Sequence, residues 1–191
     1  LLGKLWTLIV PVGSIAWRIN LFSAFCAVVA VGLLVAILQR AQVPVWATIS
    51  AAGLLACSPV LWQHAIMASL YPMHLALVAL TVFTLLRWQV GEGSPLWFAL
   101  SCGLGLAHHL VFVFAAPAFA LVVVLDGRAR PNRWKLWLKV AMVTTLTVAS
   151  SYLWLVYLGL WPLDRLFKFL FVDGQGYARY APTLSAWAQH L

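Results

Sequence analysis

The chain has 191 residues, of which 64% are hydrophobic and only 8% are charged. A soluble domain is about half apolar and about a quarter charged, so this composition excludes a soluble globular protein and indicates a multi-pass membrane protein. The net charge of +8 comes mostly from basic residues that flank apolar segments. The positive-inside rule accounts for these residues, and we expect no nucleic-acid partner.

The first apolar segment predicts a membrane span over residues 19–38, which ends at Arg40. Trp17, Arg18 and Asn20 stand at its beginning. An aromatic ring beside a cation is typical of a helix end at the headgroup layer. The same guanidinium group can bind a lipid phosphate through paired hydrogen bonds. The residues leave both interpretations of Arg18 open, as an interface anchor or as a phosphate-binding group.

Two further spans are predicted before the first clear loop. A short apolar segment covers residues 45–60 and is closed by Ser58 and Pro59, and the next covers residues 65–86 and ends at Arg87. The Gly- and Pro-rich stretch 91–95 is a predicted loop.

Residues 96–125 are apolar for thirty residues and are interrupted only by His108 and His109. One crossing needs about 20 residues, so this run predicts two short helices that meet near the histidine pair. A basic loop over residues 126–139 and a last span over residues 138–160 follow.

These segments predict an all-α membrane protein, a polytopic bundle of about six spans with short or broken helices. We expect residues 1–161 to form the bundle and residues 162–191 to form a segment on the outer face. Because the sequence opens on an apolar run without Met, we expect it to be part of a longer protein.

Alternation of the spans puts Arg40, Arg87 and the loop 126–139 on one side of the membrane. Five of the twelve Lys and Arg residues lie in that loop, so this side is predicted to be cytoplasmic. The opposite side receives most of the unusual polar groups, which predicts a polar cleft that opens outward. These groups are Arg18, Asn20, Gln63, His64, Tyr71, His74, His108 and His109.

Each of these polar residues also has a purely structural interpretation. Gln63 and His64 follow Trp62 and fit a membrane interface. Tyr71 and His74 share one helix face and could simply bond a neighbouring helix. His108 and His109 are adjacent and point apart, without the spacing of metal ligands. We therefore expect no metal and no cofactor.

Carboxylates are scarce, and none precedes Glu92. The others are Asp126, Asp164 and Asp173. A proton-coupled transporter usually carries a carboxylate within a span, so a transporter or lipid flippase is disfavoured. The absence of a clear inverted repeat disfavours it too.

The string LLGKLWTLIVPVGSIAWRINLFSAF resembles a bacterial family of multi-pass membrane proteins related to protein O-mannosyltransferases, in the GT-C class of glycosyltransferases. SPVLWQHAIMASLYPMHLALVAL and GLGLAHHLVFVFAAPAFAL are similar to later segments of the same family, with His109 at its histidine. The tail LDRLFKFLFVDGQGYARY is similar to the segment after its apolar core. The sequence departs from the family at Ser69, where an acidic residue is expected, and at His74 and His108, where Asn is expected.

The resemblance implies a GT-C-like fold and an enzyme of the bacterial inner membrane. Such an enzyme transfers a mannose-like sugar from a polyprenyl-phosphate donor to a hydroxyl group of an acceptor, such as a protein, on the outer face. Its catalytic carboxylate would precede Leu1, so no catalytic residue is expected in this chain. The chain would supply the lipid-phosphate side of the site, with Arg18, Asn20, Gln63, His64, Tyr71, His74 and His109 as candidate substrate-binding residues. The alternative is a non-catalytic membrane subunit that keeps this fold within a larger complex.

Overall fold

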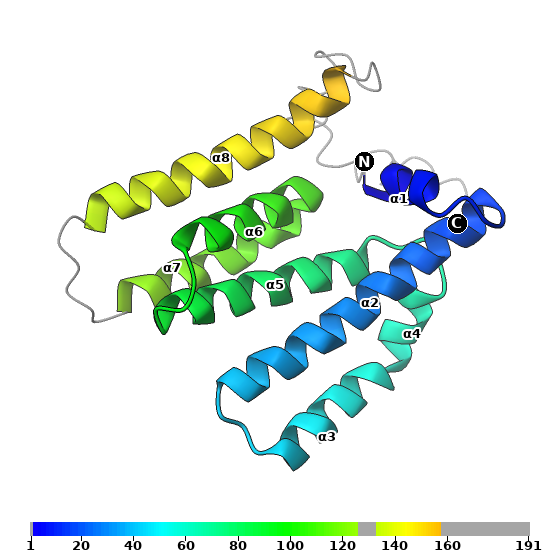
Figure 1. The fold of residues 1–191 in the computed structure, drawn as a ribbon, viewed down its shortest axis with the longest axis horizontal. Helices are drawn as coiled ribbons and strands as arrows, with labels where there is room; N and C mark the ends of the chain where they lie inside the picture. The colour runs from blue at the N-terminus through cyan, green and yellow to red at the C-terminus, as the bar shows by residue number, and fades with distance from the viewer. Residues whose placement is uncertain (1, 126–132, 158–191) are drawn as a thin grey trace, which may run out of the picture. The chain divides into compact units, whose positions relative to one another are not determined.

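The computed structural model describes residues 2–125 and 133–157, and every regular element in these ranges is a helix (Figure 1). The chain divides into two compact units, Leu1–Val148 and Ala149–Leu191. The second unit is described only over residues 149–157, which form the end of one helix. The first half of the predicted basic loop, the segment 162–191 and the expected boundary after residue 161 lie outside the described residues.

Helices α1 (Leu2–Ile9) and α2 (Ile15–Arg40) open the chain. Helix α2 contains the predicted span 19–38 and confirms it. It begins after Ser14, whose hydroxyl accepts a hydrogen bond from the Trp17 N–H at 3.2 Å, because the first N–H groups of a helix lack partners within it. Helix α1 was not expected, and its Trp6 ring packs against Phe22 and Phe25 of α2.

The predicted segment 45–60 is a pair of helices, α3 (Val45–Ala56) and α4 (Pro59–Ala65), bent by 55° at their junction. Pro59 stands in the first turn of α4, where its fixed φ favours a new helix and its missing N–H costs nothing. The indole N–H of Trp62 donates to the carbonyl oxygen of Ala56 at 2.6 Å. This bond ties α4 back onto the end of α3.

Helix α5 (Tyr71–Gln89) corrects the span predicted over residues 65–86. Ala65 is the last residue of α4, and residues 66–70 are not helical. Pro72 in the first turn of α5 explains the late start, because its missing N–H is tolerated in a first turn but would remove a hydrogen bond from the interior of a helix that began at residue 65.

The long apolar run forms α6 (Pro95–His108), the short 3₁₀ helix η1 (Leu110–Ala115) and α7 (Ala116–Leu125). The predicted break at the histidine pair is confirmed, but the second of the two predicted helices is divided into η1 and α7. His109 breaks the run with an extended backbone at φ −152°. Helix α8 (Arg133–Tyr157) contains the described part of the last predicted span. It already begins at Arg133, so the second half of the predicted loop 126–139 is helical.

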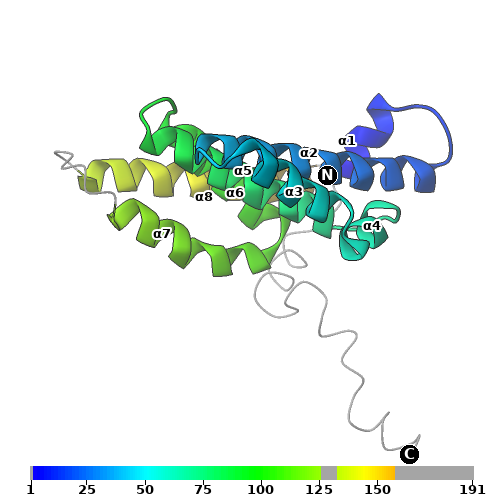
Figure 2. The ribbon, with the colours of Figure 1, turned by 90° about the horizontal axis from the view of Figure 1, so that it is seen from below.

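Within the first unit, α2 lies between α3 and α5, and α6 lies beside α5 (Figure 1). Helix α7 lies on one face of this layer (Figure 2), where Phe119 contacts Phe98 and Phe112. The main apolar core joins α5 to α8 and consists of Leu85, Trp88, Phe98, Ala99, Phe112, Phe119 and Val140.

Three helical stretches in the described residues are long and apolar enough to cross a membrane: Ile15–Arg40, Tyr71–Gln89 and Lys135–Trp154. The bent pair α3–α4 makes a fourth if it counts as one span. The chain is therefore a helical membrane protein, while the number of about six spans stays a prediction.

Candidate functional site

Four aromatic and imidazole rings gather where the ends of α4, α5 and α6 meet; we call them the histidine cluster and define it as His64, Tyr71, His74 and His109. The ring centres of His64 and Tyr71 are 4.6 Å apart, and those of His74 and His109 are 5.4 Å apart. Tyr71 joins the two pairs, with its ring centre 6.5 Å from that of His109. Residues from three separate segments thus meet as the alternation of spans predicted.

Ser69 holds this junction together. Its hydroxyl lies 3.0 Å from Nδ1 of His64 and accepts a hydrogen bond from the backbone N–H of Tyr71 at 3.3 Å. Its own backbone N–H donates to the hydroxyl of Ser23 on α2 at 3.2 Å. Ser69 therefore fixes the ring of His64 and connects the cluster to α2.

Local hydrogen bonds determine where two of the histidines carry their protons. The backbone N–H of Val111 donates to Nδ1 of His109 at 3.2 Å, so the neutral ring carries its proton on Nε2. Nε2 of His108 lies 3.0 Å from the carbonyl oxygen of Leu70, which can only accept, so His108 donates there. His109 thus keeps an N–H donor, and His108 supports the chain before α5.

His74 has a buried Nδ1 atom without a hydrogen-bond partner among the described residues. Its ring meets Phe112 edge-on, with ring centres 6.2 Å apart. An unpartnered buried nitrogen costs about 1–3 kcal/mol unless a ligand or water satisfies it. The atom is therefore a point where a bound polar group would be stabilising.

Arg18 lies outside the histidine cluster. Its guanidinium group donates to the carbonyl oxygen of Thr7 at 2.9 Å and to that of Gly13 at 2.9 and 3.1 Å. Thr7 belongs to the last turn of α1, so Arg18 caps that helix end. These bonds use three of its five N–H donors, and the one carboxylate among the described residues, Glu92, pairs with Arg40 and not with Arg18.

Asn20 and Gln63 are not brought into the cluster by any side-chain contact within the described residues. Asn20 is half-buried on α2, and Gln63 is exposed on α4. Within the same residues, no three His, Cys, Asp or Glu side chains lie close enough to hold a metal ion.

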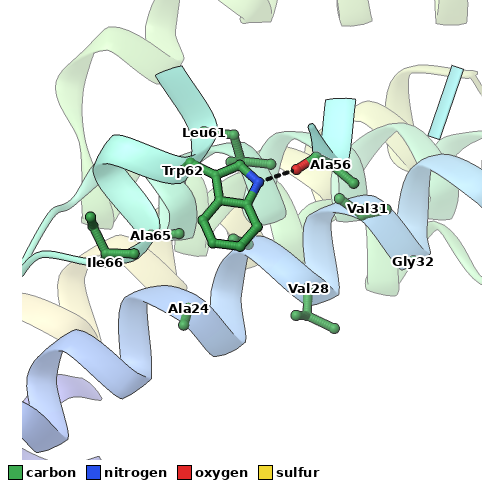
Figure 3. A pocket seen from close by; sticks show the side chains of 10 residues that line it. Ala24, Val28, Val31, Gly32, Ala56, Leu61, Trp62, Ala65 and Ile66 are labelled. Atoms are coloured by element: carbon green, nitrogen blue, oxygen red, sulfur yellow. Dashed lines mark hydrogen bonds between the residues drawn. The ribbon is translucent and has the colours of Figure 1, made fainter. Parts of the chain in front are cut away.

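An apolar groove of about 510 Å³ lies between α2 and the α3–α4 junction (Figure 3). Sequence reasoning missed it, because no pattern in the chain shows how far a bent pair opens from its neighbour. Trp62 stands in the groove and is 59% exposed. Its lining is Ala24, Ala27, Val28, Val31, Gly32, Ala56, Leu61, Trp62, Ala65 and Ile66.

The groove and the cluster share helix α4. Leu61, Trp62 and Ala65 line the groove, and His64 lies between them in the sequence. The four cluster residues themselves do not line the groove. Polar donors and an apolar surface contributed by one helix are the two kinds of contact that an amphipathic lipid makes.

The helices define a membrane protein, and the histidine cluster with the apolar groove is its candidate site. The chain belongs to the family described as the N-terminal domain of the protein O-mannosyl-transferase TMEM260, whose family model matches residues 1–134. Membership supports an O-mannosyltransferase-like function. Searches of curated proteins and of solved structures gave no match to the chain.

Proposed function

We propose that this chain forms the lipid-phosphate side of a GT-C-class membrane glycosyltransferase that uses a polyprenyl-phosphate sugar donor. The sugar is mannose-like, and the acceptor is a hydroxyl group of a protein on the outer face of the membrane. The observation that carries the proposal is that one helix, α4, contributes both to the histidine cluster, through His64, and to the lining of the apolar groove. The family relation supports the reaction class.

In this reaction the bond between the anomeric carbon and the phosphate oxygen breaks, and the acceptor oxygen bonds to that carbon. The acceptor proton passes to a carboxylate supplied from outside this chain. Negative charge grows on the departing lipid phosphate, and N–H donors fixed in a dry site stabilise it. Nε2 of His109 is one such donor, and the two remaining N–H donors and the charge of Arg18 are others.

The groove beside Trp62 would hold the first isoprenoid units of the donor. Its lining is almost wholly apolar, and Val28 and Ile66 at its edge are exposed. A hydrocarbon chain can therefore enter from the bilayer without crossing a polar surface. Asn20, Gln63, His64, Tyr71 and His74 complete the proposed substrate-binding set around the phosphate and the sugar.

The proposal includes the sidedness of the chain. The loop 126–139 would lie in the cytoplasm of a bacterial cell, and the cluster would face away from it, at the outer surface of the inner membrane. Arg40 and Arg87 support this arrangement, because both guanidinium groups lie over the ring of Phe83 at one end of the bundle.

Sugar transfer by the full-length protein in proteoliposomes tests the function. With a radiolabelled polyprenyl-phosphate mannose donor, we expect Arg18→Ala to lower the transfer rate by about 10²-fold. Arg18→Lys keeps the charge and should retain more activity. Lys139→Ala, which removes an exposed cation of α8, is the matched control and should transfer at the parental rate. Parental activity in Arg18→Ala would refute the phosphate role.

A second candidate is a non-catalytic membrane subunit of a larger complex. It is favoured by one observation: Glu92, the only carboxylate among the described residues, is paired with Arg40, far along α2 from Ser23 and the cluster. Purification with stoichiometric protein partners and without bound donor lipid would support this candidate. Transfer activity of the purified protein alone would exclude it.

A further inference from the structure

A second pocket, of about 610 Å³, lies between the C-terminal ends of α2 and α5. We call it the arginine pocket. Its polar side is formed by Gln39, Arg40, Gln42, Gln89 and Glu92, and its apolar side includes Ala36 and Leu86. The site proposed for the sugar donor does not use it. Arg40 lies seventeen residues after Ser23 on one helix, which corresponds to about 26 Å.

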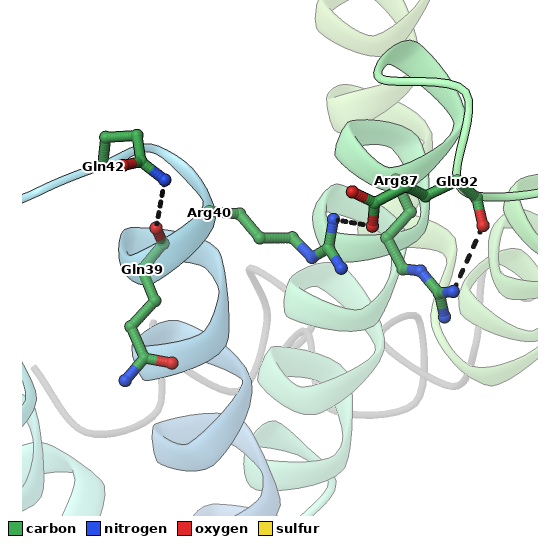
Figure 4. A network of polar contacts seen from close by, with 5 residues as sticks. All are labelled: Gln39, Arg40, Gln42, Arg87 and Glu92. Atoms are coloured by element: carbon green, nitrogen blue, oxygen red, sulfur yellow. Dashed lines mark hydrogen bonds and ion pairs between the residues drawn. The ribbon is translucent and has the colours of Figure 1, made fainter.

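Among the described residues, two cations, Arg40 and Arg87, and one carboxylate, Glu92, lie at or beside this pocket (Figure 4). Arg40 pairs with Glu92 at 2.6 Å, and Arg87 donates to the backbone oxygen of the same residue at 3.2 Å. Both guanidinium groups lie within 6 Å of the Phe83 ring centre, at 5.6 and 5.9 Å. One carboxylate thus faces two cations, which leaves a positive charge for an anionic ligand.

Arg87 does not line the pocket, but it bonds to Glu92, which does, and one of its N–H donors has no partner among the described residues. Its Nε atom is buried and has no hydrogen-bond partner among the described residues. A buried guanidinium N–H without a partner is unfavourable. The Arg40–Glu92 pair is different, since Arg40 is 31% exposed and Glu92 is 56% exposed. Exposed ion pairs are weak, so a ligand can displace Glu92 from Arg40 at little cost.

Gln42 adds an observation that is independent of charge. It has φ +57° and is the only residue other than glycine with a positive φ in the described part of the chain. It stands just after α2, where the N–H of Val43 bonds to the carbonyl oxygen of Leu38. Glycine is the usual residue at this point because it adopts positive φ without strain. Gln42 lines the pocket, and its amide Nε2 donates to the carbonyl oxygen of Gln39 at 3.5 Å, which holds the amide group at the pocket wall (Figure 4).

We propose that the arginine pocket binds the phosphate diester of an anionic membrane phospholipid. The phosphate accepts paired hydrogen bonds from Arg40 in place of Glu92, and the amide groups of Gln39, Gln42 and Gln89 bind the rest of the headgroup. The acyl chains begin at the apolar side formed by Ala36 and Leu86. A phospholipid is favoured over a soluble phosphate because the pocket is half apolar and terminates a membrane-spanning helix.

Lipid retention by the full-length protein, without any sugar donor, tests this proposal independently of the transferase. Native mass spectrometry would count phosphatidylglycerol bound from mixed micelles, with phosphatidylcholine as the neutral comparison. We expect Arg40→Gln to weaken phosphatidylglycerol binding about tenfold. Glu92→Gln should strengthen it severalfold, because the competing carboxylate is gone. Lys139→Gln measures unspecific attraction, and an equal loss in that variant would overturn the proposal.

Two further experiments test whether a loss of binding reflects unfolding, and whether the ligand is a phospholipid or a soluble anion. Gln42→Gly should raise the melting temperature by about 2–4 °C while it weakens phosphatidylglycerol binding, so a loss of binding cannot come from unfolding. Unchanged binding in Gln42→Gly would contradict the amide contact. Inorganic phosphate or glycerol phosphate should not compete at millimolar concentration, and competition by either would overturn the assignment to a phospholipid.

Discussion

The side-chain hydroxyl of Ser23 contacts both backbone groups of Ser69, a residue 46 positions further along the chain. It accepts a hydrogen bond from the Ser69 N–H at 3.2 Å and lies 3.3 Å from the Ser69 carbonyl oxygen, to which it can donate. Ser23 is almost fully buried. The non-helical link between α4 and α5 is thereby fixed to the middle of α2, and the histidine cluster depends on that link.

Ser23→Ala should lower the free energy of unfolding by about 1 kcal/mol, because the part-buried N–H of Ser69 loses its partner. Denaturant unfolding of the purified protein in detergent measures this. Ser50→Ala is the control, since Ser50 is exposed and its hydroxyl bonds only within its own helix. Equal effects of the two substitutions would show that the contact with Ser69 is unimportant.

Gly103→Ala should destabilise the packing of α6 against the first part of α8. A Cβ atom at Gly103 would lie 2.5 Å from Cβ of Thr147, well inside van der Waals contact. Overpacking of this kind costs about 1–3 kcal/mol. Gly53→Ala on α3 meets nothing within 4 Å and should instead stabilise by about 0.5–1 kcal/mol. Thermal unfolding measures both variants, and the melting temperature should fall for Gly103→Ala and rise for Gly53→Ala.

His109→Phe should lower sugar transfer by about 10²-fold, because the ring packing stays but the Nε2–H donor is lost. The bond from Val111 N–H is lost as well, which should cost about 1 kcal/mol of stability. His108→Phe is a matched control with a similar stability loss, through its bond to Leu70, and should keep most of its transfer activity. Equal transfer by both variants would remove His109 from the site.

Trp62→Phe should weaken the bend between α3 and α4. It deletes the N–H that donates to the Ala56 carbonyl at 2.6 Å and should cost about 0.5–1.5 kcal/mol. Trp46→Phe, at a position 74% exposed, should change stability by less than about 0.5 kcal/mol. Chemical denaturation of the two variants, followed by circular dichroism, gives the difference.

The helices could be predicted wherever the chain itself marks their ends. Arg40 closes α2, and the histidine pair divides residues 96–125, because a basic end and an interrupted apolar run are visible in the sequence. Residues 66–70 have the same apolar composition as the helices beside them, so the start of α5 was placed too early. Its position depends on Pro72 and on the contact of Ser69 with Ser23, which joins residues far apart in the chain.

The candidate site, like the helices, could be predicted only where the order of the segments along the chain determines it. Alternation of spans brought His64, Tyr71, His74 and His109 to one end, since that argument needs only segment order. The bonds of Arg18 to Thr7 and Gly13 could not be foreseen, because they depend on how the link after α1 turns back. Ser69 looked like a lost acidic residue and is instead the hydrogen-bonding centre of the junction.

The bend between α3 and α4 also has a consequence for the surrounding lipid. The depth that the bent pair can cross is limited by its length. If the 12 residues of α3 lie along the membrane normal and the 7 residues of α4 are turned by 55°, the pair crosses only ~24 Å. The hydrocarbon layer of a bilayer is ~30 Å thick. A bilayer adapts to such a short face by thinning. The leaflet beside Trp62 would therefore be dimpled, and its headgroups would descend toward the depth of His64. The protein would in this way shorten the path by which a lipid phosphate leaves the membrane surface.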